Sequence, residues 1–430
     1  MTYHNAVKYI HQAPKEMPES VAGERLRRML DTLGTPQRHL RYLRLAGSNG
    51  KTVCAELLMS VYRQSDNTVG CLTMPLRADV REGILINGSP LSFDTVAALV
   101  ERVRSTVTAI SRTDAERTAA TEEEAVTGPS SFVPTGSEIL LCVALLAFEE
   151  ANCRLCIIES DHEHTDPTRF LPSPIAAAIC GTIPGSDRKE IKKIRSYLSH
   201  GIPEIVSAPQ DKDAYRMISD TCATLNCRLT IPTRSELSVE RLALRGSTFT
   251  YRGKAYSIPL CGRFQVANAT VVLEILNMLA RRGYPLSDEQ IAQGFKQIRI
   301  PCKFEILSIA PTIIADSTHS EVAVEPVCDS MADFADTIGK TVRLCLPDAA
   351  TAKRYLAVLE PKGYRIESVI LYGQSESETN DLANAVRCHT VKETVKQALA
   401  DLAPTDILLL SGPYAFTSEI RYELLKALGY

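Results

Sequence analysis

The chain has 430 residues, which is enough for two or three domains, and its 45% hydrophobic and 23% charged residues are typical of a globular protein. Lys and Arg number 48 and Asp and Glu 51, so the formal net charge of −3 provides no strongly basic field for a nucleic-acid duplex or an anionic membrane. Apolar runs stay below the roughly 18 residues of a membrane span, the N-terminus lacks the apolar core of a secretion signal, and 13 scattered cysteines favour free thiols and a cytoplasmic location.

Apolar, β-branched segments alternate with helical patterns along the chain, which predicts an α/β protein with a mostly parallel sheet. In the first part we expect a helix over 24–33, a strand over 42–46, a helix over 51–64 and a strand over 68–73. The polar segment 112–131 has no apolar periodicity, and we interpret it as a loop or a frayed helix end.

The next predicted element is a helix over 137–151, whose residues are nearly all apolar, so it should be buried against the sheet. It leads into a short apolar strand over 155–160, which ends in a carboxylate, and further strands are expected over 175–180 and 204–207. Short alternating strands separated by glycine turns are predicted over 229–261.

The last part of the chain begins with a predicted helix over 268–282. A change in composition follows at 297–302, and strand–helix alternation resumes from residue 312 onward. We therefore predict two domains, residues 1–298 and residues 299–430.

A glycine-bearing turn joins the predicted strand 42–46 to the helix that follows it. Six residues form the turn and the start of the helix: Gly47, Ser48, Asn49, Gly50, Lys51 and Thr52. Glycines allow backbone N–H groups to converge on an anion, a lysine supplies a charge for phosphate oxygens, and a hydroxyl suits Mg²⁺. The spacing G-x-x-G-K-T is shorter than the common P-loop. We interpret this phosphate loop (residues 47–52) as a nucleotide site rather than as a structural turn with an exposed lysine.

Over most of its length, including this loop, the sequence resembles the folylpolyglutamate synthase family and, more broadly, the Mur ligases. LRLAGSNGKT at 43–52 resembles the family's P-loop, and INGSPLS at 86–92 resembles the segment after its second strand. GRFQVANA at 262–269 resembles the motif G-x-H-Q-x-x-N-A. Residues 316–319 resemble the start of D-G-A-H-N-P, and residues 411–414 resemble T-G-S-L-Y.

The resemblance implies a Mur-ligase-like α/β fold, in which a P-loop ATP-binding domain (1–298) carries a mostly parallel sheet. A smaller, Rossmann-like α/β ligase domain (299–430) follows, with ATP between the two. The implied activity is that of an ATP-dependent carboxylate–amine ligase, which converts a substrate carboxylate to an acyl phosphate that an amino group then attacks. The implied amine is glutamate, the acceptor is folate-like, and ATP and Mg²⁺ are the cofactors. The resemblance favours a monomer whose partners are small molecules.

The resemblance also assigns roles to individual residues. It implies that Lys51, Glu159 and His319 are catalytic, and that Thr52 and Glu159 hold Mg²⁺. The implied ATP contacts are Gly47, Ser48, Asn49, Gly50, Lys51, Thr52, Asn268, Lys303, Asp316 and His319. From its residue type alone, Asn268 equally suits a helix cap, and Glu159 suits a solvated strand end.

Several positions depart from the family pattern. A glycine-rich run of the family becomes the glycine-free segment 160–169. The family's second-metal histidine falls on Ser186, its carbamylated lysine on Ile194, and the serine of T-S-P-H on Met74. A hard Mg²⁺ ion prefers oxygen ligands, which neither Ile194 nor Met74 provides. We therefore expect the nucleotide-binding part of the site to be retained and the second metal site to be lost.

Two hypotheses from different classes remain open on the sequence. The first is the ligase, including a ligase whose acceptor has changed. The second is a divergent paralogue that binds nucleotide without turnover and serves as a partner or regulatory subunit. Cys153 and Cys156 form C-x-x-C, but their apolar surroundings favour core thiols over zinc or redox chemistry.

Overall fold

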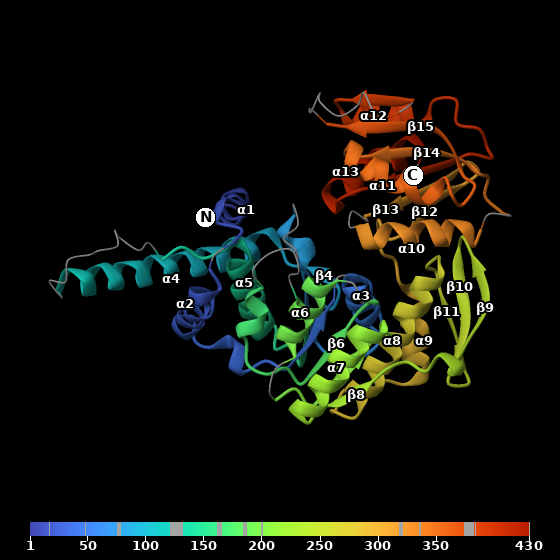
Figure 1. The fold of residues 1–430 in the computed structure, drawn as a ribbon. Helices are drawn as coiled ribbons and strands as arrows, with labels where there is room; N and C mark the ends of the chain where they lie inside the picture. The colour runs from blue at the N-terminus through green and yellow to red at the C-terminus, as the bar shows by residue number, and fades with distance from the viewer. Residues whose placement is uncertain are drawn as a thin grey trace. The chain divides into compact units, whose positions relative to one another are not determined.

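The structure is a computed structural model of the whole chain. It describes all residues except Met17, Ser48, 75–78, 121–131, 161–165, 184–186, 199–200, 318–320, 335–336, 374–381, 383 and Tyr430. The chain forms two compact units, in each of which helices and strands alternate (Figure 1). Unit 1 contains Met1–Pro232 and Val271–Gly294, and unit 2 contains Thr233–Thr270 and Phe295–Tyr430.

Unit 1 is built on an eight-stranded sheet with the strand order β4-β3-β2-β5-β1-β6-β7-β8. Its strands are β1 (Tyr42–Ala46), β2 (Val69–Leu72), β3 (Ile84–Ile86), β4 (Ser89–Pro90), β5 (Leu155–Glu159), β6 (Ala176–Ile179), β7 (Glu204–Ser207) and β8 (Arg228–Thr230). The strands from β2 to β8 in this order pair in parallel, whereas β3 and β4 join as an antiparallel extension. The carboxyl ends of β5, β1 and β6 therefore lie side by side at one edge, where ligands of open α/β sheets bind.

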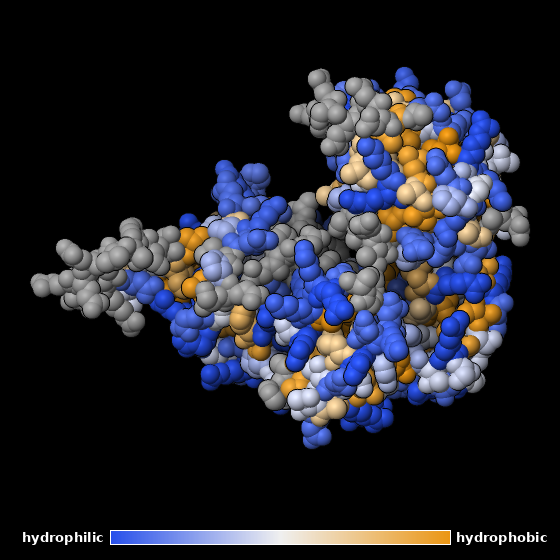
Figure 2. Space-filling view, viewed as in Figure 1, coloured by the Kyte–Doolittle hydropathy of each residue, from blue (hydrophilic) through white to orange (hydrophobic). Residues whose placement is uncertain are grey.

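Helices accompany this sheet along the chain. They are α1 (Tyr3–Gln12), α2 (Glu19–Thr32), α3 (Lys51–Tyr62), α4 (Phe93–Ala120), α5 (Gly136–Glu150), α6 (Arg188–Tyr197) and α7 (Lys212–Leu225), with parts of α8 (Arg263–Ala280) and α9 (Asp288–Gln297). Figure 2 shows mainly hydrophilic residues over the outward side of α6 and α7. None of the described helices is both long and apolar enough to cross a membrane.

The central helix α5 is buried along almost its whole length, as its apolar sequence predicts. A capping box begins it: the Thr135 side chain accepts the Glu138 N–H, and the Glu138 carboxylate accepts the Thr135 N–H. The same carboxylate is held by Arg25 of α2, whose Nε and Nη2 each donate to one of its oxygens at 2.9 Å. A buried, bidentate ion pair therefore joins α2 to the start of the core helix.

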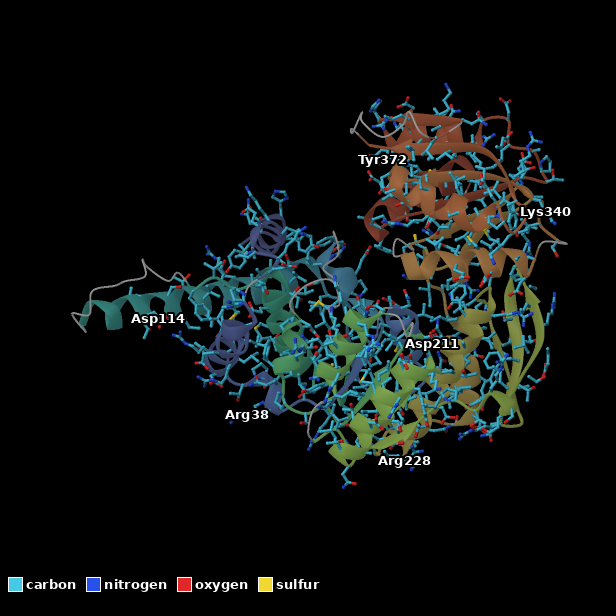
Figure 3. All side chains as sticks on the ribbon, viewed as in Figure 1. Arg38, Asp114, Asp211, Arg228, Lys340 and Tyr372 are labelled. Carbon is cyan, nitrogen blue, oxygen red and sulfur yellow. The ribbon has the colours of Figure 1, made fainter. Side chains whose placement is uncertain are left out.

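The polar segment after residue 111 is more helical than its sequence suggests. The helix α4 continues to Ala120, so residues 112–120 are not a loop, while 121–131 lie outside the described residues. Charge pairs replace apolar periodicity here: Arg28 Nη2 donates to Asp114 Oδ1 at 2.6 Å, and Arg112 lies 3.7 Å from Glu116 (Asp114 is labelled in Figure 3). Pairs four residues apart support a helix without a buried stripe.

Unit 2 contains an antiparallel sheet of three strands, in the order β11-β10-β9, and a sheet of six strands, in the order β12-β13-β17-β14-β15-β16. The strands are β9 (Leu237–Ala243), β10 (Gly246–Tyr251), β11 (Lys254–Ile258), β12 (Glu305–Ile309), β13 (Thr312–Asp316), β14 (Thr341–Leu346), β15 (Arg365–Tyr372), β16 (Ala385–Cys388) and β17 (Ile407–Ser411). Only β12 is antiparallel within the larger sheet. Its helices are α10 (Glu321–Ala332), α11 (Ala349–Leu359), α12 (Val391–Leu399) and α13 (Tyr414–Ala427).

The two compact units are not separated by a single boundary after residue 298. Residues 233–270, which hold β9 to β11 and the first turns of α8, belong with the C-terminal residues. One reason is a side-chain contact: Gln265 Nε2 donates to the Lys303 carbonyl oxygen at 3.2 Å. The helix α8 also begins at Arg263, five residues before the predicted start at Asn268.

Candidate active site

The phosphate loop connects the carboxyl end of the buried strand β1 to the first residue of α3. Gly47 has φ = +117° and Gly50 has φ = +78°, conformations that residues with a side chain rarely adopt. Gly50 occupies the N-cap position of α3 and has no side chain with which to cap the helix. The first amide groups of the helix, with the positive end of its dipole, thus form a ready anion-binding site.

Gly47 is also required by a close approach of two backbone segments. A Cβ atom at this position would lie 2.1 Å from the carbonyl oxygen of Cys180, the residue that follows β6. Gly181 is similarly constrained, because its Cβ would lie 2.7 Å from the Asn49 carbonyl oxygen. Gly47 and Asn49 are therefore packed closely against the residues that follow β6.

We expect Gly47→Ala to lower the free energy of unfolding by about 2 kcal/mol and to weaken nucleotide binding, because the methyl group displaces the loop from β6. Gly34→Ala is the matched control, since Gly34 also has φ = +94° but a Cβ there would meet nothing within 4 Å. That variant should lose about 1 kcal/mol from backbone strain alone and keep nucleotide affinity. Urea unfolding and titration with the ATP analogue AMPPCP measure both effects. Equal losses in the two variants would contradict the packing argument.

The structure brings together three residues predicted for phosphate and metal binding. Glu159 ends β5 and lies opposite Leu45 of β1 in the parallel register. Its carboxylate oxygens both lie 3.2 Å from the Thr52 hydroxyl, which donates to them. Lys51 Nζ lies 3.9 Å from Glu159 Oε1 and donates to the Gly47 carbonyl oxygen at 2.5 Å. Lys51 and Glu159 are only 3% and 2% exposed, so their charges act in a region of low dielectric.

The oxygens of Thr52 and Glu159 fit the chemistry of Mg²⁺. This ion prefers oxygen ligands and is usually held by one or two carboxylates together with substrate phosphates and water. Among the described residues, no group of three or more His, Cys, Asp or Glu side chains gathers as a complete metal site. A hydroxyl and a single carboxylate beside a phosphate loop suit a cation that arrives with a nucleotide.

A pair of thiols, which the sequence did not single out, lies beneath the loop. Cys54, in the first turn of α3, is completely buried and shares a hydrogen bond with Cys180. This hydrogen bond and burial raise the pKa of Cys54 well above its usual range, and the charge of Glu159 adds to the effect. The Cys54 thiol therefore stays protonated and serves packing rather than nucleophilic chemistry. All thirteen cysteines are free thiols in the structure.

Three of the residues predicted in unit 2, Asn268, Lys303 and Asp316, are linked through hydrogen bonds around the segment 302–304. Asp316, at the end of β13, is buried and its Oδ2 accepts the Phe304 N–H at 2.7 Å. Asn268 Nδ2 donates to Gln265 Oε1 at 3.3 Å, and Gln265 in turn donates to the Lys303 carbonyl. Because α8 begins at Arg263, Asn268 lies inside the helix, and its reading as a helix cap is wrong.

The other positions singled out in the sequence are either in the hydrophobic core or outside the described residues. Met74 and Ile194 are buried in two hydrophobic clusters and offer no oxygen to a metal. Ser48, Ser186 and His319 lie outside the described residues. The roles expected of Ser48 and His319 stay predictions.

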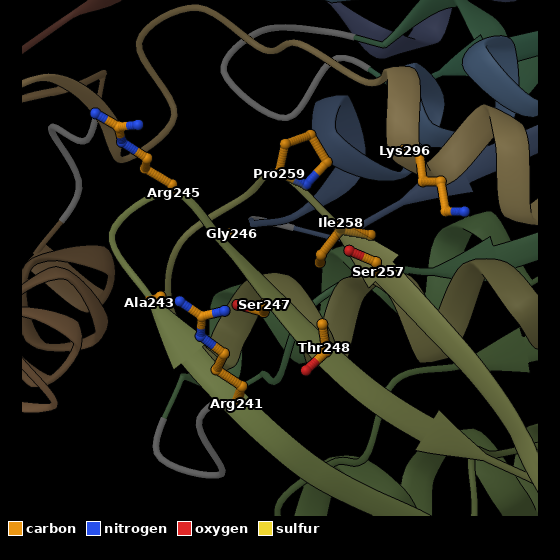
Figure 4. Close-up of a pocket in the computed structure, with 10 residues that line it drawn as sticks. All are labelled: Arg241, Ala243, Arg245, Gly246, Ser247, Thr248, Ser257, Ile258, Pro259 and Lys296. Atoms are coloured by element: carbon orange, nitrogen blue, oxygen red, sulfur yellow. The ribbon is translucent and has the colours of Figure 1, made fainter.

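A pocket of about 190 Å³ lies in unit 2 and is lined by none of the predicted site residues (Figure 4). It is lined by strands of the small antiparallel sheet and by Lys296 of α9. Arg241 lies beside Ser247, whereas Arg245 and Lys296 extend in different directions (Figure 4). The cations do not converge on one point, so the pocket does not compete with the phosphate loop as a nucleotide site.

The chain is similar to several known proteins over most of its length. No family model matches the chain. A folylpolyglutamate synthase from Lacticaseibacillus casei is 24% identical, and the alignment covers 99% of both chains. A probable bifunctional folylpolyglutamate synthase/dihydropteroate synthase from Halobacterium salinarum is 25% identical over 98% of this chain. Over nearly its whole length, the chain is therefore similar to proteins named folylpolyglutamate synthase.

Solved structures of the folylpolyglutamate synthase family share the fold. A folylpolyglutamate synthase complex with AMPPCP and folate superposes with a TM-score of 0.78 and 21% identity, covering 99% of this chain and 100% of that chain. The prediction of a two-domain, Mur-ligase-like α/β fold is thus confirmed. The chain spans about half, 51%, of the length of the Halobacterium relative, whose name includes a second activity.

Proposed function

We propose that this chain is an ATP-dependent carboxylate–amine ligase that adds glutamate to a folate-like acceptor. The observation that carries the proposal is the grouping of Lys51, Thr52 and Glu159 at the phosphate loop, in a chain that matches folylpolyglutamate synthases over its full length. The solved complex with AMPPCP and folate supports ATP and a folate as the ligands.

The residues of the phosphate loop have distinct tasks in this reaction. Backbone amides at the start of α3 and the Lys51 ammonium would neutralise phosphoryl oxygens and fix the triphosphate for transfer to a carboxylate. Thr52 and Glu159 would hold Mg²⁺, which supplies further charge neutralisation when bound. Burial of Lys51 and Glu159 strengthens each of these electrostatic interactions.

The ligase is favoured over a paralogue without turnover. The lysine and the hydroxyl of the phosphate loop, Lys51 and Thr52, are present, and Lys51 has the carboxylate of Glu159 as a neighbour at 3.9 Å. The relatives that match over most of the chain carry the names of synthases rather than of regulatory subunits. Loss of oxygen ligands at Met74 and Ile194 changes the site beyond the phosphate loop and leaves the loop itself untouched.

Further parts of the proposal concern residues and properties outside the loop. We include Asn268, Asp316 and His319 as ATP contacts, because they match the family motifs, and Lys303, which keeps the positive charge of the arginine that the family has at this position. Free thiols support a cytoplasmic location. We also propose that the protein acts as a monomer on small molecules.

An acceptor-dependent assay tests the proposed activity. The purified protein is incubated with ATP, Mg²⁺, glutamate and a panel of reduced folates and pteroates, and both ADP and the glutamylated product are measured. We expect ADP release to require an acceptor and to match product formation, and Glu159→Gln to reduce both by about 10²-fold. Folded protein that binds AMPPCP but forms no product with any acceptor would favour the paralogue without turnover.

A further inference from the structure

The turn 302–304, which leads into β12, has an unusual backbone. Cys302 has φ = +56° and Phe304 has φ = +52°, left-handed conformations that cost free energy in residues with a side chain. Both of these side chains are buried, whereas Lys303 between them is only partly buried. Lys303 is one of the residues that we assign to ATP. A strained turn of this kind persists only where the surrounding structure fixes it.

Two hydrogen bonds from the end of β13 hold this turn. The Phe304 N–H donates to Asp316 Oδ2 at 2.7 Å. The Ser317 N–H donates to the Cys302 carbonyl oxygen, also at 2.7 Å. These bonds lie on the two sides of Lys303, so the backbone is fixed both before and after the lysine.

An ion pair between the first residue of β12 and the helix α13 adds a third support. The Cys302 N–H donates to Glu305 Oε2 at 2.9 Å. Arg421 of α13 donates two hydrogen bonds to the same carboxylate, from Nε to Oε2 at 2.5 Å and from Nη2 to Oε1 at 2.6 Å. A bidentate guanidinium fixes the plane of a carboxylate. Arg421 therefore sets the orientation of the oxygen that accepts the Cys302 N–H.

Attachment of α13 to unit 2 does not depend on this ion pair. The apolar side chains of Phe416, Ile420 and Leu424 are buried in a hydrophobic cluster, and they hold the helix against the larger sheet. The side chains of Arg421 and Glu305 are 22% and 25% exposed, and a partly exposed ion pair adds little to such packing. The pair is instead specific in its geometry, because it leads to one backbone N–H of the turn.

We propose that Glu305 and Arg421 are positioning residues for the nucleotide, which hold the turn 302–304 in its left-handed conformation and thereby fix the place of Lys303. The inference rests on the proposed function, because it takes Lys303 as an ATP contact. Glu305 and Arg421 act through the turn and are not assigned a contact with ATP. A turn that is ordered before the nucleotide arrives leaves less conformational entropy to be lost on binding.

A double-mutant cycle separates positioning from general stability. Arg421→Gln, Lys303→Gln and the double variant of the full chain are titrated calorimetrically with AMPPCP in the presence of Mg²⁺. We expect each single substitution to raise the Kd about ten-fold, the size expected for loss of one charge-assisted contact. The double variant should also show about a ten-fold rather than about a 100-fold increase, because both residues act on one interaction. Lys426→Gln, which removes an exposed cation of the same helix, is the matched control and should keep the wild-type Kd.

Hydrogen exchange measures the support of the turn without nucleotide. The Cys302 amide should exchange about ten-fold faster in Arg421→Gln than in the wild type, because the carboxylate that accepts its N–H is no longer held in one orientation. In Lys426→Gln the exchange rate should be unchanged.

Several outcomes would overturn the proposal. One is a Kd for Arg421→Gln within about two-fold of the wild type, even where the melting temperature falls, and another is a pair of effects that multiply in the double variant. An unchanged exchange rate of the Cys302 amide in Arg421→Gln would refute the support of the turn. If the wild type binds AMPPCP and Lys303→Gln has no effect, the proposal fails while the phosphate loop stands. Wild-type protein that does not bind AMPPCP would instead refute the proposed function itself, and the positioning of ATP with it.

Discussion

Lys51→Ala is expected to lower the rate of ligation by about two to three orders of magnitude, which corresponds to roughly 3–4 kcal/mol of transition-state stabilisation. Lys51 is buried at the start of α3, where its ammonium faces both the phosphate loop and Glu159. Its removal takes away the one fixed side-chain charge of the loop itself. The measurement is kcat at saturating ATP and acceptor, with ADP and product both quantified.

The control for this substitution is Lys212→Ala, which removes an exposed lysine at the start of α7 and should leave kcat within about two-fold of the wild type. Thermal melting of each variant establishes that both are folded. Turnover in Lys51→Ala within about three-fold of the wild type would contradict a phosphate-binding role for Lys51. If the wild-type protein has no acceptor-dependent turnover and the substitution changes only its nucleotide affinity, the protein is the paralogue without turnover.

Arg25→Ala should produce the largest loss of stability, about 3–5 kcal/mol in the free energy of unfolding. Arg25 and Glu138 are both buried, and their guanidinium and carboxylate groups are joined by two hydrogen bonds of 2.9 Å. Truncation of the arginine leaves the Glu138 carboxylate in the core with Thr135 as its hydrogen-bond donor among the described residues. Urea unfolding monitored by circular dichroism gives the free energy.

Arg27→Ala on the same helix is the matched control. Arg27 is 60% exposed and pairs with Glu24 and Asp31 at the surface, where ion pairs contribute less than about 1 kcal/mol. Both substitutions remove a positive charge, but only Arg25→Ala breaks a buried ion pair. The difference between their losses of unfolding free energy therefore measures the effect of burial. Similar losses in the two variants would show that the Arg25–Glu138 pair is not a core interaction.

Much of unit 1 was predictable from local patterns. The strand β1 and the buried helix α5 match the expected segments closely, because continuous apolar runs of these lengths have few other stable environments. The meeting of Thr52 with Glu159 was also predictable, since both follow strands whose carboxyl ends share one sheet edge. Local sequence and a topological rule are sufficient for these features.

Features that depend on remote segments were not predictable in the same way. The extension of α4 through residues 112–120 depends on Asp114 pairing with Arg28, which is 86 residues away in sequence. Residues 233–270 are grouped with the C-terminal residues, and the hydrogen bond of Gln265 to the Lys303 carbonyl is one contact between these segments that no local pattern predicts. Such contacts are set by tertiary packing, which overrides the propensity of each segment.

Glu190 illustrates a signal that was present in the sequence and is informative only with the structure. Its spacing from Ile194 and Tyr197 places all three on one face of a helix, so a buried glutamate was implied. The structure shows that the residue is indeed buried, at 9% exposure.

The most direct test of the account is a calorimetric titration of the full chain with AMPPCP, with and without Mg²⁺. The account predicts saturable binding that is stronger with Mg²⁺, because Thr52 and Glu159 hold the cation beside the triphosphate. The same ligand should raise the melting temperature by mass action. Absence of binding heat and of a melting shift at millimolar AMPPCP and Mg²⁺ would contradict the assignment of the loop after β1 as a nucleotide site.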